Sequence, residues 1–334
     1  MVLRNGGGIA AKGVFLTIAH PFVLIDHPCY RDHDTGGGLH PEVPGRLAAI
    51  QERLAGSPLA ARMRVCPPRS IHRSEVLAVH AEPYLFRLEE ACLSGQTSID
   101  HSDNQICYDS FDVALQSAAA GLSAIDLIEG QEAGAVFCAA RPPGHHAERA
   151  TALGFCFLNN VAIAARYWQQ AYGRQRIFII DWDAHHGNGI QSVFEHDPDV
   201  FYASVHEHPT FSFPGTGFGE EHGTGAGSGA TLNLPLPPGA DDAMLLEVMH
   251  NRVAPAFEAF QADALLVAAG FDGHQDDDMS GLCYSTAVYK ALGGLMGQWA
   301  KLCQGRAVSI LEGGYHLQAL PLSVEAYLEG LTSV

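Results

Sequence analysis

The chain has 334 residues, 47% of which are hydrophobic, and a formal net charge of −18 at pH 7. The shortage of Lys and Arg argues against binding to the phosphate backbone of nucleic acids, whereas the excess of Asp and Glu suits a cationic substrate or serves solubility alone. We expect no membrane-spanning segment and no signal peptide, because the Gly-rich start lacks a continuous apolar stretch. Eight Cys without a C-x-x-C pair are typical of free thiols in a reducing compartment, which predicts a cytoplasmic protein.

Apolar runs that alternate with helical patterns predict an α/β protein whose parallel sheet is buried on both faces. In chain order, the expected strands are residues 22–27, 134–140, 176–181, 200–206, 262–269 and 307–311. Helices are expected at residues 47–54 and 113–128. Residues 154–160 are expected to open a third helix that runs through Tyr167, with Asn159 or Asn160 as its N-cap. Residues 100–109 are expected to form a polar loop. No linker divides the chain, so we expect one domain, residues 1–334, with residues 1–20 as a candidate arm that joins subunits of a homo-oligomer.

One of these strands ends in the most informative stretch of the sequence. Asp181, Asp183 and His185 follow the apolar run of residues 177–180. Since side chains alternate along a strand, we expect these three to point to one side of the sheet and the residues between them to the other. Open α/β sheets bind ligands at the carboxyl ends of their strands, and an oxygen ligand beside a nitrogen ligand there predicts a divalent metal.

Three other strands also end in polar groups. They lead to His145 and His146, to Asp272 and to Tyr315. An exposed loop explains any one of these clusters, but four of them at strand ends favour one shared site. Asp183, His185 and Asp272 would form a three-ligand metal site with open positions, the arrangement of a catalytic rather than a structural metal.

The residue types at these strand ends predict hydrolysis of an amide. A metal held there would polarise a carbonyl group and lower the pKa of a coordinated water. His145 and His146 can take a proton from water and give one to a leaving amine, and Asp181 is placed to orient an imidazole. Tyr315 can donate a hydrogen bond to a tetrahedral oxyanion.

With these motifs the chain resembles the histone deacetylase family, specifically its class II branch, which includes bacterial histone deacetylase-like amidohydrolases and acetylpolyamine aminohydrolases. The matching motifs occur in the family's order, over residues 141–147, 154–160, 181–189, 213–217, 270–272 and 312–315. The resemblance covers about residues 22 to 320. It implies the arginase/deacetylase type of α/β fold, a parallel sheet of about eight strands with helices on both faces.

The resemblance also implies the metals and the catalytic roles. Zinc, with ferrous iron as the alternative, is expected at Asp183, His185 and Asp272, with His145 and His146 as the acid/base pair and Tyr315 polarising the acyl carbonyl. A structural potassium is implied near Asp181, Asp183, His185, Ser204 and Val205, and a second one around Phe194, Asp197 and Val200.

Six further positions correspond to the substrate channel of the family. Phe155 and Phe213 match the two walls of a narrow acyl-lysine channel, and Gly154 matches the carbonyl that accepts a substrate N–H. The resemblance implies that Asp103 holds the substrate backbone at the rim, that Arg46 lines an internal product channel and that Met279 occupies the gate.

The chain departs from parts of the family pattern. Asn188 stands where class I members carry Asp, which leaves His146 with a neutral partner. Met279 stands where many relatives carry Leu and a polyamine-selective relative would carry Glu. The long insertion of the bacterial acetylpolyamine hydrolases is not visible between residues 84 and 113. These points weaken a strict polyamine assignment, although the acidity of the chain leaves it open. His274 is expected either to contact the rim or to be solvated.

Two other functions are weighed against an acyl-amine hydrolase. A binuclear manganese ureohydrolase would need further aspartates, but Gly187 and His274 stand two residues past His185 and Asp272. A non-catalytic acyl-amine binding module would have lost a catalytic residue, whereas every expected position is filled. Acetyl-lysine on proteins, acetylated polyamines, longer acyl-lysines and unrelated small amides or esters all remain candidate substrates.

Overall fold

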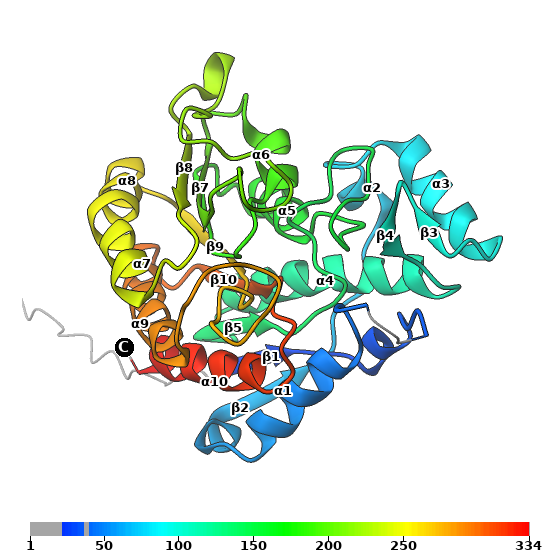
Figure 1. Cartoon of the computed structure of the whole chain (residues 1–334), viewed down its shortest axis with the longest axis horizontal. Helices are drawn as coiled ribbons and strands as arrows, with labels where there is room; N and C mark the ends of the chain where they lie inside the picture. The colour runs from blue at the N-terminus through cyan, green and yellow to red at the C-terminus, as the bar shows by residue number, and fades with distance from the viewer. Residues whose placement is uncertain (1–21, 37–39, 334) are drawn as a thin grey trace, which may run out of the picture.

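The computed structural model describes residues 22–36 and 40–333 (Figure 1). An eight-stranded sheet lies at its centre, in the order β2-β1-β5-β10-β9-β6-β7-β8, and every neighbouring pair in it is parallel. The predicted α/β class and strand number are confirmed. The candidate arm, residues 1–20, lies outside the described residues.

The bounds of the elements are as follows. The strands of the large sheet are β1 (Phe22–Ile25), β2 (Met63–Cys66), β5 (Ala135–Cys138), β6 (Ile177–Asp181), β7 (Val200–Glu207), β8 (Thr231–Leu236), β9 (Ala264–Ala269) and β10 (Ala307–Leu311), and β3 (Ser98–Ile99) and β4 (His101–Gln105) form a small antiparallel sheet. The helices are α1 (Gly45–Ala55), α2 (Arg73–Val76), α3 (Glu82–Leu93), α4 (Ser110–Glu129), α5 (Asn160–Tyr172), α6 (Asn188–Phe194), α7 (Asp242–Val248), α8 (Ala254–Phe260), α9 (Thr286–Leu302) and α10 (Ala319–Thr332). Shorter helical segments are Pro28–Arg31, Pro58–Arg62, Gly225–Gly227 and Met249–Val253.

Helices cover both faces of the sheet. In β10, adjacent side chains face opposite layers: Ser309 bonds to Tyr327 of α10 at 2.7 Å, and Ile310 lies against Gly121 of α4. Strands covered on both sides can be apolar throughout, and every residue of β6 and β9 is buried. This explains why the central strands were predictable from continuous apolar runs.

Two parts of the chain differ from the sequence-based expectation. Residues 100–109 are not a plain loop, because β4 within them pairs with β3; its polar sequence carries no alternating apolar signal. The helix expected to open at residues 154–160 begins only at Asn160, since Gly154 and Phe155 have left-handed φ angles of 54° and 67°. Asn159 is the N-cap, and its side chain accepts a hydrogen bond from Ala162 N at 3.0 Å.

The long helix α4 corrects another expectation. It is long and apolar enough to cross a membrane, but 72% of its most apolar window is buried within the protein. It packs against α5 and the sheet, where Gly121 would bring a Cβ to 3.0 Å from both Ala164 Cβ and Ile310 Cδ1. Burial on this scale explains its composition as that of a core helix.

Two adjacent glycines of α9 test how closely α9 packs against α10. A Cβ at Gly293 would lie 2.0 Å from the backbone oxygen of Tyr327, whereas a Cβ at Gly294 meets nothing within 4 Å. We expect Gly293→Ala to lower the free energy of unfolding by about 1–3 kcal/mol, because backbone atoms must separate. Gly294→Ala is the matched control and should raise it by up to about 1 kcal/mol, since Ala favours helix. Urea unfolding followed by circular dichroism measures both; equal effects would contradict the close helix contact.

Candidate active site

The predicted polar residues meet at the carboxyl edge of the sheet. His145 and His146 follow β5, Asp181 ends β6, Asp272 follows β9 and Tyr315 follows β10. Strand β6 ends at Asp181, so simple strand alternation does not continue through Asp183 and His185. Their side chains nevertheless converge, because the segment after β6 is fixed by its own hydrogen bonds: Asp183 N donates to Asp181 Oδ1 and His185 N donates to Asp183 Oδ1, each at 3.1 Å.

Asp183, His185 and Asp272 form a group that could hold a metal ion. Their ligand atoms all lie within 4.8 Å of one another and the three residues are buried. His185 Nδ1 lies 3.1 Å from Asp183 Oδ1 and 3.0 Å from Asp272 Oδ2, while its Nε2 lies 3.1 Å from the carbonyl oxygen of Met279. If Nε2 carries the proton and donates it to that carbonyl, the Nδ1 lone pair faces the two carboxylates. Two carboxylate oxygens and one imidazole nitrogen suit a divalent cation such as zinc.

Backbone groups hold the two carboxylates in place. Gly313 N donates to Asp183 Oδ2 at 2.7 Å, and Ala184 N donates to Asp272 Oδ1 at 2.9 Å. Burial, together with the nearby charge of Asp183, raises the pKa of Asp272 above its usual range. A Cβ at Gly313 would lie 2.3 Å from Asp272 Oδ2, so this position has room only for glycine. A bound cation would offset the repulsion between these buried anions.

The two histidines after β5 have different partners. His145 Nδ1 lies 3.1 Å from Asp181 Oδ2, whereas His146 Nδ1 lies 2.8 Å from Asn188 Oδ1. Burial lowers the pKa of His145, but Asp183 and Asp181 outweigh it and raise that pKa to about 10. Burial and the nearby His145 and His185 hold the pKa of His146 well below its usual range. The predicted contact of Asp181 with an imidazole and the neutral partner of His146 are both present.

Tyr315 is held in position by three residues around it. Its backbone N–H donates to Asp277 Oδ2 at 2.6 Å, and its ring packs edge-on against Phe155 at 5.8 Å between centroids. The guanidinium carbon of Arg46 lies 4.8 Å from the centre of the Tyr315 ring. Burial, opposed in part by Arg46, holds the pKa of Tyr315 well above its usual range, so its hydroxyl remains a hydrogen-bond donor.

Arg46 is buried and not part of a surface ion pair. Its Nε donates to the carbonyl of Gly314 at 2.6 Å, and its Nη2 donates to the carbonyl of Glu312 at 2.5 Å. A third bond joins Nη1 to Glu42 Oε1 at 3.2 Å. Arg46 therefore fixes the backbone on the amino side of Tyr315, which the sequence did not predict.

The predicted channel residues lie beside the two histidines. A Cβ at Gly154 would meet His146 Cδ2 at 2.4 Å and Phe213 Cε1 at 2.9 Å, so these three residues are in close contact. The Phe213 ring is 5.0 Å from the ring of His146 and is 42% exposed. Phe155 packs edge-on against Tyr315, with 5.8 Å between the ring centroids.

Asp103 and Met279 lie near these walls. The carbonyl of Asp103, in β4, lies 2.9 Å from His40 Nε2, and the His40 ring is 4.7 Å from that of Phe155. Met279 is partly exposed and places its backbone carbonyl against His185. Asp103 thus lies near Phe155 through His40, and Met279 lies beside the candidate metal ligand His185.

The residues expected around the first potassium lie in β6, in β7 and in the segment that follows β6, and those expected around the second lie between the end of α6 and the start of β7. Asp181 pairs with Ser204 across β6 and β7, and Val205 follows in the same buried strand. The second group surrounds the end of α6, where Asp197 N donates to the carbonyl of Phe194 at 2.8 Å, close to Val200 at the start of β7. The carboxylate of Asp197 is already paired with Arg166 at 2.6 Å. Backbone oxygens would therefore be the ligands of a potassium ion at this position.

Several residues that position the site were not assigned a role from sequence. Glu312 accepts hydrogen bonds from Gly144 N at 2.7 Å and His145 N at 3.0 Å and so ties the histidine loop to β10. Glu42 accepts from Arg141 at 2.5 and 2.8 Å, which anchors the start of the same loop. The motifs contain Arg141 and Glu312, but only the folded chain shows their partners.

His274 is neither solvated nor placed by any described contact at the rim. It is 3% exposed, and its Nε2 lies 3.0 Å from Thr286 Oγ1. Its Nδ1 accepts a hydrogen bond from Asp276 N at 3.1 Å. His274 therefore stabilises the loop after β9 and its junction with α9.

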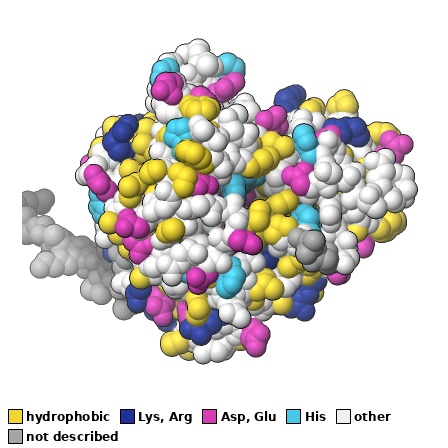
Figure 2. Space-filling view, in the orientation of Figure 1, with side chains coloured by type: hydrophobic (Ala, Val, Ile, Leu, Met, Phe, Trp, Pro, Cys, Tyr) yellow, Lys and Arg dark blue, Asp and Glu magenta, His cyan; other side chains and the backbone are white. Residues whose placement is uncertain are grey.

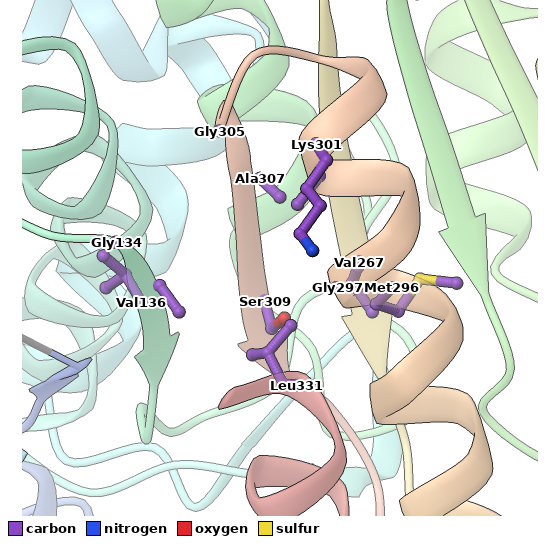
Figure 3. Close-up of a pocket in the computed structure, with 12 residues that line it drawn as sticks. Gly134, Val136, Val267, Met296, Gly297, Lys301, Gly305, Ala307, Ser309 and Leu331 are labelled. Carbon is purple, nitrogen blue, oxygen red and sulfur yellow. The ribbon is translucent and has the colours of Figure 1, made fainter. Parts of the chain in front are cut away.

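A cavity of about 140 Å³ lies between the sheet and helices α9 and α10 (Figure 3). It is lined by residues near the amino ends of β5 and β10, among them Val136 and Ala307, and by Met296 and Lys301 of α9. Among the described residues that line it, Lys301 is the one Lys, Arg, His, Asp or Glu, and the predicted site residues are absent. This cavity is therefore distinct from the candidate active site.

Comparison with known proteins identifies the class to which this fold and site belong. The family model of the histone deacetylase domain matches residues 40–331. The chain therefore belongs to the histone deacetylase family, whose members are hydrolases acting on amides, as its motifs predicted.

Individual relatives extend this result. The chain is 38% identical to histone deacetylase 14, chloroplastic, of Arabidopsis thaliana over 85% of its own length and 71% of the relative's. It is 33% identical to a histone deacetylase-like amidohydrolase of Pseudomonas aeruginosa over 88% of its length and 77% of the relative's. It is 36% identical to polyamine deacetylase HDAC10 of Danio rerio over 85% of its length and 43% of the relative's.

A solved structure confirms the predicted fold type. The crystal structure of the HDA15 HD domain superimposes with a TM-score of 0.86 and 31% sequence identity, covering 94% of this chain and 90% of that one. The arginase/deacetylase fold predicted from the motifs is therefore the fold of this protein.

Proposed function

We propose that the protein is a zinc-dependent amidohydrolase that removes an acetyl or short acyl group from an amine, as in acyl-lysine or acylpolyamines. The observation that carries the proposal is the meeting of Asp183, His185 and Asp272 beside two buried histidines and Tyr315. Zinc, or alternatively ferrous iron, would be held by those three ligands. When bound, it would polarise the acyl carbonyl and lower the pKa of a water molecule.

The protein's own side chains would move the protons and stabilise charge. His146, kept neutral by burial and by the nearby His145 and His185 and oriented by Asn188, would take a proton from the attacking water. The histidine pair, with rings 3.9 Å apart, would return a proton to the leaving amine. Tyr315 would donate its O–H to the oxyanion that develops on the acyl oxygen. Asp181 would keep His145 in its orientation through the 3.1 Å contact.

The channel residues would select an acylated amine. Phe155 and Phe213 would enclose the aliphatic chain, the Gly154 carbonyl would accept a substrate N–H, and Asp103 would bind the substrate at the rim. Arg46 would border an internal route for the carboxylate product, although its three bonds to Glu42, Glu312 and Gly314 also support a positioning role.

Further parts of the proposal concern ions and cellular context. One structural potassium would bind near Asp181 and Ser204, and a second near Phe194 and Val200, largely through backbone oxygens. The protein would be cytoplasmic, which agrees with its eight free Cys. It would bind neither nucleic acid nor membrane, which agrees with the net charge of −18. A homo-oligomer is the remaining expectation.

The acidity of the chain keeps acetylpolyamines as a second substrate class. Asp and Glu are spread over the face in Figure 2, whereas Lys and Arg lie mainly toward its edge. Such a surface would attract a polycation. A non-catalytic binding module is the alternative from another functional class, and the complete set of catalytic side chains supports an enzyme against it.

Variants separate metal binding from carbonyl polarisation. Asp183→Ala and His185→Ala should abolish both bound zinc and turnover, because each removes a ligand. Tyr315→Phe should retain the metal and lower kcat by about 10²–10³, the usual effect of losing one oxyanion donor. Metal analysis by plasma mass spectrometry and turnover of an acetyl-lysine peptide provide the readouts. Full turnover in metal-free protein would refute the proposed chemistry.

A substrate panel distinguishes a lysine deacylase from a polyamine deacetylase. The panel contains an acetyl-lysine peptide, a trifluoroacetyl-lysine peptide, acetylputrescine and acetylspermidine. We expect Met279→Glu to raise kcat/KM for acetylspermidine relative to the acetyl-lysine peptide by tenfold or more, since a gate carboxylate attracts the polyamine, whereas Met279→Leu, the uncharged control, should not. An unchanged ratio in Met279→Glu would show that Met279 does not face the substrate.

A further inference from the structure

A second group of reactive side chains lies away from the proposed catalytic residues, where β4 leads into α4. Cys107 is partly exposed, and Ser110, the first residue of α4, donates its hydroxyl to Cys107 Sγ at 3.3 Å. Ser110 Oγ also accepts a hydrogen bond from Cys107 N at 2.8 Å. The same oxygen lies 2.7 Å from His33 Nδ1. A hydroxyl therefore connects the sulfur to an imidazole.

The imidazole of His33 is backed by a buried carboxylate. His33 and Glu42 are 3% and 2% exposed, and His33 Nε2 lies 3.5 Å from Glu42 Oε2. Burial lowers the pKa of His33, but its contacts with Cys107 and Glu42 outweigh this and raise it. An imidazolium in this position can donate one N–H to Ser110 Oγ and direct the other toward Glu42. The order Cys107, Ser110, His33, Glu42 is that of a nucleophile, a proton relay, an acid and an orienting carboxylate.

The surroundings of Cys107 favour its thiolate. Burial raises its pKa, but the side chains of His33 and Ser110 and the backbone N–H groups of Asp109 and Asp34 outweigh that effect and lower it to about 7. The N-terminus of the 20-residue helix α4 adds a favourable dipole three residues away. One contact opposes ionisation, because the thiol can donate its S–H to the backbone carbonyl of Asp32, 3.3 Å from Cys107 Sγ.

Cys29 provides an internal comparison. It is also partly exposed. Burial and the nearby carboxylates of Asp32 and Asp26 raise its pKa to about 11. The set of hydrogen-bond donors around Cys107 is thus a feature of that site and not of every thiol in this part of the chain.

We propose that Cys107 is a nucleophilic thiolate that hydrogen peroxide and small alkyl hydroperoxides oxidise to a sulfenic acid. The thiolate attacks one peroxide oxygen, so that an S–O bond forms as the O–O bond breaks. The departing hydroxide or alkoxide takes a proton from His33 through Ser110 and leaves as water or alcohol. Sulfur is oxidised by two electrons and the peroxide is reduced by two. The oxidant must be small because the sulfur is partly buried. The nearby acid, His33, can protonate the hydroxide or alkoxide that leaves.

The same charge network reaches the loops of the proposed active site. Glu42, the partner of His33, also binds Arg141, at the start of the loop that carries His145, and Arg46, which holds the backbone before Tyr315. The thiol site itself does not depend on the proposed deacetylase activity. It can be tested by chemical labelling alone.

Competitive labelling of the folded protein tests the proposal. With limiting iodoacetamide at pH 7 and mass spectrometry of each Cys, Cys107 should react about 100-fold faster than Cys29, because its larger thiolate fraction outweighs its lower intrinsic nucleophilicity. It should also react faster than Cys283, although Cys283 is exposed and Cys107 only partly so. Brief treatment with hydrogen peroxide and dimedone should place the sulfenic-acid adduct on Cys107. Labelling that follows exposure, with Cys283 fastest, or a dimedone adduct on other thiols only, would overturn the proposal.

Two variants test the relay. Ser110→Ala and His33→Gln should each slow labelling and peroxide oxidation of Cys107 by about tenfold or more, and leave the rate at Cys283 unchanged. The buried Cys138 should remain unlabelled in both, which verifies that the variants are folded. If a variant exposes Cys138, the comparison rests on the other variant and on Cys107 against Cys29 in the unaltered chain. An unchanged Cys107 rate in both folded variants would refute the relay.

Discussion

Two buried carboxylates, those of Asp183 and Asp272, lie against the same nitrogen of His185. Backbone hydrogen bonds from neighbouring loops hold the carboxylates in this position. The carboxylates sit 3.1 and 3.0 Å from His185 Nδ1, a costly arrangement in a buried site unless positive charge compensates it. Backbone N–H groups of Gly313 and Ala184 bind the outer oxygens. Position 313 requires glycine, because a Cβ there would collide with both carboxylates. A divalent cation is the compensation that the donor set fits best.

Parallel strand order explains how distant residues reach this point. The neighbours β5, β10, β9 and β6 end at one edge of the sheet, so residues that follow them are brought together although they span positions 145 to 315. Longer-range polar bonds then fix each loop. Glu312 ties the histidine loop to β10, and Glu42 joins Arg141 to Arg46. These buried ion pairs and hydrogen bonds position the loops of the site. They add little to the free energy of folding, because desolvation of the buried charges offsets their attraction.

The sequence predicted the central strands and the residues at their ends, because strands covered on both faces are continuous apolar runs and a polar residue at their end stands out. Edge elements were harder to predict. Strand β2 is half exposed and β4 has the polar sequence His-Ser-Asp-Asn-Gln, so neither carries an apolar pattern. The bonds of Glu312 to the histidine loop and of Arg46 to Gly314 were not predictable, since they join residues more than 160 positions apart. Left-handed backbone at Phe155 likewise displaced a helix start that the local sequence favoured.

Titration of metal-free protein with zinc tests most directly whether Asp183, His185 and Asp272 form one catalytic metal site. After chelation and removal of the chelator, turnover of an acetyl-lysine peptide and of acetylspermidine is followed together with bound metal, at constant potassium. We predict no turnover without metal, linear recovery that stops at about one equivalent of zinc, and no recovery in Asp272→Ala, as expected for one three-ligand site. Turnover that persists in metal-free protein, or zinc that binds equally well to Asp272→Ala, would contradict this assignment.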